Sequence, residues 1–150
     1  MSMQTIHETI LSSHLISHWE RISEKFLTLA AALPEATYGF SPNGDTRTVA
    51  EVLRHVAFWN YFVAEAARGN KFDDTINEIP RETYATRSEI LAELKHSATE
   101  AAQALKNRKS GMEPQTAEML TTFIEHTCEH YGQLAVYARL NGIVPPASHS

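Results

Sequence analysis

The sequence has a single cysteine, little basic charge and no long hydrophobic run. With only Cys128 present, an intramolecular disulfide is excluded. No segment approaches the roughly 20 apolar residues that a membrane-spanning helix needs. The N-terminus also lacks the basic, apolar and small-residue zones of a signal peptide. We therefore expect a cytoplasmic protein that does not associate with a membrane.

Basic residues are too few and too scattered for a nucleic-acid-binding surface. The 150-residue chain carries 13 Lys and Arg against 18 Asp and Glu, a formal net charge of −5. Nucleic-acid-binding proteins gather positive charge on one face to displace phosphate counterions, and no such stripe is visible. We do not expect nucleic acid as a partner. The length fits one domain, and we assign residues 1–150 to it.

Four amphipathic segments dominate the chain, and no stretch alternates with the period of a β-strand. Three of them begin with Thr-x-x-Glu, a capping box in which Thr accepts from a backbone N–H and Glu turns back to the cap. These boxes are Thr5 to Glu8, Thr48 to Glu51 and Thr86 to Glu89. The fourth segment begins at a proline, which favours the first helical position. The predicted helices are residues 5–33, 48–68, 86–107 and 114–141.

The apolar spacing of these helices predicts an all-α protein, a four-helix bundle. In the first helix the expected core stripe is Leu11, Leu15, Ile22, Phe26, Leu29 and Leu33. Gly69 and Gly142 are expected to end the second and fourth helices. Residues 69–85 form the longest connection, and a connection of this length is more often functional or mobile than a plain turn.

Two histidines lie one turn apart on the predicted fourth helix. Residues His126, His130, Gln133 and Tyr137 fall within an arc of about 60° on a helical wheel, beside apolar positions. An imidazole that points into a bundle interior must find a partner there. The pair is therefore a candidate for metal binding. Its alternative is two half-buried histidines with no ligand.

His55, on the predicted second helix, is the candidate third ligand. Three neutral imidazoles with a free position are typical of a catalytic metal site. If all three share one ion, their nearest ring nitrogens should lie within roughly 3–4 Å of one another. Alone, His55 would be interpreted as a core histidine bonded to a carbonyl.

Two further groups are weaker candidates. His14 and His18 lie one turn apart on the first helix; His14 is interpreted as a boundary residue, whereas His18 is a candidate polar group lining the site. Cys128 lies about 200° around the helix from His126, so it cannot share the same ion. We expect it to be a small buried hydrophobic residue.

The chain resembles the DinB-like (DinB/YfiT-like) family of metalloenzymes over its whole length. The resemblance lies in Thr48-Val-Ala-Glu51-Val-Leu53-Arg-His55, and in the C-terminal signature His126-Thr-Cys-Glu-His130-Tyr-Gly132-Gln133-Leu-Ala-Val-Tyr137 with the Arg139, Gly142 and Pro145-Pro146 that follow. It implies a four-helix bundle that holds a divalent metal through His55, His126 and His130. Characterised relatives include transferases and isomerases that use low-molecular-weight thiols. The resemblance also implies a homodimer.

A cation held by three imidazoles keeps its full charge, and can lower the pKa of bound water or hold a substrate thiol as its thiolate. The first hypothesis is a divalent-metal-dependent enzyme acting on a small molecule, a thiol-dependent S-transferase or a hydrolase, with Gln133 and Tyr137 as substrate or second-shell contacts. Zinc or nickel is the expected ion, with iron and manganese as alternatives. The other hypotheses are a non-catalytic metal- or ligand-binding sensor, and a helical interaction module. No catalytic residue is assigned.

Overall fold

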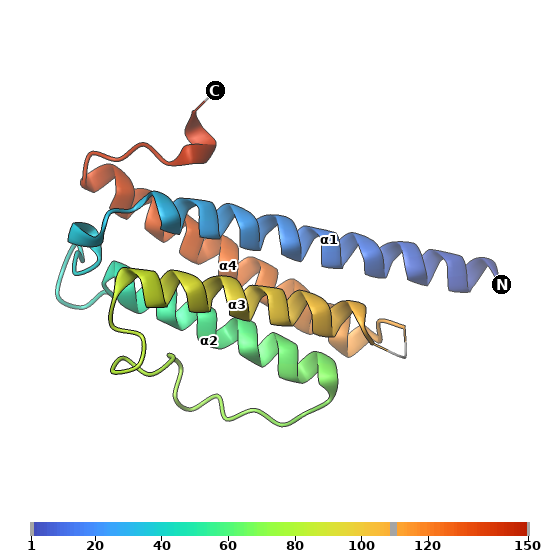
Figure 1. The fold of residues 1–150 in the computed structure, drawn as a ribbon. Helices are drawn as coiled ribbons and strands as arrows, with labels where there is room; N and C mark the ends of the chain where they lie inside the picture. The colour runs from blue at the N-terminus through green and yellow to red at the C-terminus, as the bar shows by residue number, and fades with distance from the viewer. Residues whose placement is uncertain (1, 109–110, 150) are drawn as a thin grey trace.

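The computed structural model describes residues 2–108 and 111–149, apart from the side chains of residues 4–8. Within these residues the chain forms helices and no strand, which confirms the predicted all-α fold (Figure 1). The long helices are α1 (Met3–Ala32), α2 (Val49–Arg68), α3 (Arg87–Lys106) and α4 (Pro114–Leu140). Two short 3₁₀ helices, η1 (Glu35–Thr37) and η2 (Pro146–Ser148), follow α1 and α4.

The predicted helix boundaries agree with the structure where capping residues define them. Complete capping boxes begin α2 at Thr48 and α3 at Thr86. Gly69 ends α2 in the left-handed conformation, at a φ of 78° that favours glycine. At the other end of the chain, α1 begins at Met3, two residues before the predicted Thr5. The proposed box from Thr5 to Glu8 involves side chains outside the described part of the chain.

The order of the helices around the bundle differs from their order in the sequence. The adjacent pairs include α1 with α3, α3 with α2, α2 with α4, and α4 with α1. Helices α1 and α2 are therefore diagonal, and the connection between them crosses one end of the bundle (Figure 1). This arrangement places α2 directly against α4. The two helices that carry the candidate histidines are thus neighbours.

The core consists of two clusters of buried side chains, one toward each end of the bundle. The larger cluster contains Leu29, Leu53 and Leu134, and the other contains Trp19 and Leu120. None of the helices in the described residues has both the length and the apolar character that a membrane-spanning segment requires.

The first helix buries less of its predicted stripe than expected. The N-terminal end of α1 extends beyond the ends of the other helices (Figure 1). Leu11, predicted to be in the core, is 62% exposed, and Ile10 beside it is 58% exposed. Ile22, Phe26, Leu29 and Leu33 are buried as predicted, and Leu15 is half-buried. The prediction for Leu11 was wrong because no neighbouring helix reaches its turn.

Candidate metal centre

The structure brings His55 of α2 together with His126 and His130 of α4. The Nε2 atoms of His55 and His126 are 3.0 Å apart. The ring centre of His130 lies 4.8 Å from that of His55 and 4.5 Å from that of His126. One nitrogen from each ring can be chosen so that all three lie within 4.8 Å of one another. This spread is somewhat wider than the predicted 3–4 Å. The group has the composition of a metal site.

A backbone carbonyl fixes the orientation of His55. This side chain is 6% exposed, and its Nδ1 lies 2.8 Å from the carbonyl oxygen of Asn77. A carbonyl can only accept a hydrogen bond, so Nδ1 carries the proton. In the neutral ring, Nε2 then carries the lone pair, and it can accept a hydrogen bond from Nε2 of His126 at 3.0 Å. This is the tautomer that a metal ligand requires, with the second nitrogen donating to an outer group.

A series of hydrogen bonds fixes the orientation of the His130 ring. Its Nδ1 lies 2.8 Å from Oε1 of Gln133, whose Nε2 donates to the Tyr137 hydroxyl at 2.8 Å. The hydroxyl in turn donates to the carbonyl of Arg47 at 3.0 Å. Because Gln133 donates at one end, it accepts at the other, and Nδ1 of His130 carries the proton. Gln133 thus contacts the group from behind, and Tyr137, which is only 3% exposed, holds Gln133 in place.

The three imidazoles are neutral at physiological pH. Burial lowers the pKa of His55 to about 4 and that of His126 to about 3. Burial also lowers the pKa of His130, against the hydrogen bond with Gln133, which raises it. The positive charge of Arg47 lowers all three pKa values further. Neutral nitrogens are available to a cation without the release of protons.

An aromatic wall flanks one side of the histidine group. Trp59 and Phe123 stack with their ring centres 5.3 Å apart, and both contact His126, at 6.2 Å and 5.7 Å between ring centres. Phe62 packs against both aromatic rings. These side chains are half-buried. They give the group an apolar border, which strengthens electrostatic interactions next to it.

Three residues singled out in the sequence lie away from this group. His18 is exposed and forms a hydrogen bond with Arg21, so the prediction that it lines the site was wrong. Trp19, which is 1% exposed, occupies the core position and turns His18 outward. His14 is exposed, as expected for a residue outside the site. Cys128 is a free, exposed thiol, so its predicted burial was wrong. Thr127, 2% exposed, takes the inward position instead.

Gln133 lies on the predicted arc and contacts His130, but other outer contacts of the histidines were missed in the sequence. Asn77 and Arg47 lie near the group but share no helical repeat with a histidine, whereas Trp59 does, and its indole bonds the same loop residue as His55. Asn77 lies in the connection between α2 and α3, whose length was the only signal in the sequence. Trp59 lies one helical turn after His55 and was expected only as an apolar core residue.

The structure is thus a four-helix bundle in which a largely buried three-histidine group between α2 and α4 could hold a metal ion. The family model of the DinB superfamily matches residues 18–134, most of the chain. The chain belongs to the DinB superfamily, a metal-binding family, as the sequence resemblance predicted. No curated protein matches it significantly.

Proposed function

We propose that His55, His126 and His130 together hold one divalent metal ion, zinc or nickel by preference, with iron or manganese as alternatives. The convergence of three imidazole nitrogens within 4.8 Å carries the proposal. The donor set fits, because imidazole suits the late transition metals and zinc. In two of the rings, Nδ1 already donates to an acceptor. The second nitrogen of a metal-ligating histidine usually makes such a bond.

The proposed activity is that of a metal-dependent enzyme acting on a small molecule, by thiol-dependent S-transfer or by hydrolysis. A bound divalent cation would act as a Lewis acid that favours the deprotonated form of a thiol or of water. Gln133 and Tyr137 would hold His130 in place. Trp59 and Phe123 would exclude water on one side and contact an apolar part of the substrate. We propose a low-molecular-weight thiol as the co-substrate of the transferase. We also propose that the protein acts in the cytoplasm.

Alanine variants of the histidines test the metal site. Replacing His126 or His130 should remove the metal and the activity together, while the apolar core keeps the bundle folded. His14→Ala and His18→Ala are matched controls, since both side chains are exposed, and should retain the metal. Metal stoichiometry, measured beside circular dichroism, compares the four variants. Loss of metal from His14→Ala with retention in His126→Ala would contradict the assignment.

One observation favours a second candidate function, a non-catalytic metal- or ligand-binding sensor. Within the described residues, the group that can hold a metal consists of histidines only and includes no carboxylate to act as a general base. A turnover screen with thiols and electrophiles, with and without metal, separates the two functions. Metal-dependent product formation supports the enzyme, whereas tight metal binding without turnover supports the sensor.

We also propose that the protein forms a homodimer through the exposed end of α1. Ile10 and Leu11 are apolar, adjacent and more than half exposed there, and burial against a second copy would remove them from water. Light scattering at micromolar concentration should give twice the chain mass of 16.8 kDa. Leu11→Glu should halve that mass, whereas Leu140→Glu on α4 should not. A wild-type mass near 16.8 kDa would contradict the dimer.

A further inference from the structure

The connection between α2 and α3 contacts the histidine group through one residue, Asn77. Its carbonyl oxygen accepts from Nδ1 of His55, and its side-chain Oδ1 accepts from the Trp59 indole at 2.9 Å. Asn77 has a φ of 61°, the only positive value at a non-glycine residue in the described chain. Asparagine tolerates this left-handed conformation better than most residues. One loop residue therefore bonds two side chains that lie one turn apart on α2.

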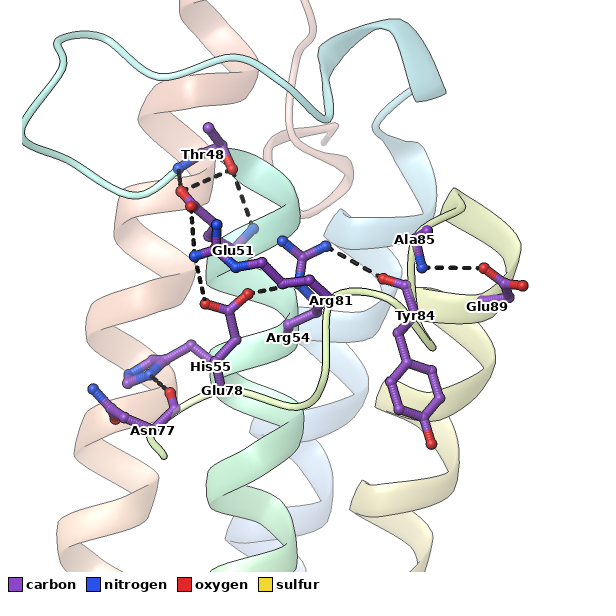
Figure 2. A network of polar contacts seen from close by, with 10 residues as sticks. All are labelled: Thr48, Glu51, Arg54, His55, Asn77, Glu78, Arg81, Tyr84, Ala85 and Glu89. Carbon is purple, nitrogen blue, oxygen red and sulfur yellow. Dashed lines mark hydrogen bonds and ion pairs between the residues drawn. The ribbon is translucent and has the colours of Figure 1, made fainter. Parts of the chain in front are cut away.

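An ion-pair network holds the next residue, Glu78, against α2 (Figure 2). Its Oε1 lies 2.6 Å from Nε of Arg54, and its Oε2 lies 3.1 Å from Nη2 of Arg81. The same atom of Arg81 lies 2.8 Å from Glu51, in the capping box that begins α2. Glu78 is thus held between two arginines, immediately after the residue that bonds His55.

Arg54 is the anchor of this network. It immediately precedes His55, and its side chain is only 8% exposed. Its Nη1 donates to the carbonyl of Tyr84 at 3.3 Å, so that it fixes the loop at a second point (Figure 2). Its own carbonyl accepts from the backbone N–H of Ile79 at 3.5 Å. A buried guanidinium needs such partners, because an unpaired buried charge is strongly unfavourable.

We propose that the Arg54–Glu78 ion pair is a positioning device for the metal site. By fixing the loop on α2, it places the Asn77 carbonyl where it selects the Nδ1-protonated tautomer of His55, and so leaves Nε2 unprotonated. Arg54, Asn77 and Glu78 are positioning residues that act through His55. This inference rests on the proposed function in one respect, that a divalent cation is the ligand. The tautomer itself can be measured in the metal-free protein.

The test compares Glu78→Ala with Glu100→Ala. Glu100 pairs with Arg68 at 2.6 Å near the other end of α2, and makes a matched control for the loss of an ion pair. Nitrogen-15 imidazole spectra of the metal-free protein report which nitrogen of His55 is protonated. Zinc affinity is measured by competition with a chromophoric chelator. Wild-type protein and Glu100→Ala should show His55 protonated on Nδ1 and should bind zinc equally.

In Glu78→Ala, His55 should populate both tautomers, and zinc affinity should fall roughly 10- to 100-fold. If that variant does not fold, Glu78→Gln, which removes the charge but keeps the shape, should shift the tautomer in the same direction. Asn77→Gly keeps the carbonyl and the positive φ, and should leave the tautomer unchanged. An unchanged tautomer in the folded Glu78 variants, or a loss of affinity without a tautomer change, would overturn the inference. Tight zinc binding by His126→Ala would instead overturn the proposed metal site.

Discussion

The three histidines of the candidate site differ in what holds their second ring nitrogen. His55 is bonded to a loop carbonyl and His130 to the Gln133 side chain. His126 is instead placed by the aromatic rings of Trp59 and Phe123 and by His55 itself. Outer hydrogen bonds orient metal ligands and raise their basicity. A substitution at one of these neighbours should therefore disturb mainly the orientation of the histidine that it contacts.

The first prediction concerns Gln133, the outer partner of His130. Gln133→Met keeps a similar size but removes the acceptor for Nδ1 and the donor to Tyr137. Metal affinity should fall about 10-fold, since outer contacts of metal-ligating histidines typically have effects of this order. Glu118→Gln, an exposed change on the same helix two turns before His126, is the control. Equal affinities for zinc in the two variants, measured by chelator competition, would show that Gln133 does not support the site.

At the level of single residues, helical spacing grouped His126 and His130 with Gln133, but it could not place the neighbours that come from loops. Spacing put His126 and His130 on one face because residues four apart align on a helix. The same rule grouped His14 with His18, and it misjudged His18 because Trp19 fills the core position beside it. Asn77 could not be predicted, since its contact with His55 depends on the path of a loop through space.

At the scale of elements, helix ends were more predictable than helix faces. Capping boxes, glycine caps and a proline at the first position are local signals, and they defined α2, α3 and the start of α4. Whether an apolar face is buried depends on the lengths of the neighbouring helices. Leu11 therefore lies on the predicted stripe but not in the core.

A pair of leucines on α4 tests the assignment of its buried face. Leu134 is fully buried in the larger core cluster, whereas Leu140 is 60% exposed. Leu134→Ala should lower the free energy of unfolding by about 2–5 kcal/mol because it leaves a cavity. Leu140→Ala should change it by no more than about 0.5 kcal/mol. Urea unfolding followed by circular dichroism measures both, and similar losses would contradict the packing described above.

The capping box of α2 gives a pH-dependent prediction. The backbone hydrogen bond from Thr48 lowers the pKa of Glu51 below its usual 4.5, and the hydrogen bonds and charge of neighbouring groups, Arg81 among them, add to this effect. A lowered pKa in the folded state stabilises the protein above the ordinary pKa. That stabilisation is lost as the pH falls through the folded-state value.

Glu51→Gln retains the capping hydrogen bonds but removes the charge. It should lower the free energy of unfolding by about 0.5–1 kcal/mol at pH 7. The difference from wild type should shrink once the pH falls below 4.5. Denaturant unfolding at neutral and acid pH measures it, with Glu129→Gln as the control. A difference that stays constant across this range would mean that the charge of Glu51 plays no part.

For the molecule as a whole, the order of the helices around the bundle determines which side chains can meet in the candidate site. Because α1 and α2 are diagonal, α2 lies against α4, and His55 meets the pair one turn apart on α4. The number of helices could be predicted from apolar periodicity. Periodicity does not say which helices are neighbours, so the contact of α2 with α4 was expected only because His55 was grouped with the pair and the family resemblance agreed. The connection from α2 to α3 then returns along α2 and covers His55 from outside, as its contacts with Arg54 and His55 show (Figure 2).

Anomalous X-ray diffraction from crystals of zinc-loaded protein shows directly whether His55, His126 and His130 bind one metal ion. We predict a single strong anomalous peak between α2 and α4, with the Nε2 atoms of His55 and His130 and one ring nitrogen of His126 about 2.0–2.1 Å away. His126→Ala crystals prepared identically should lack the peak. A zinc peak at His14 and His18, or none near the three histidines in fully loaded protein, would contradict the account.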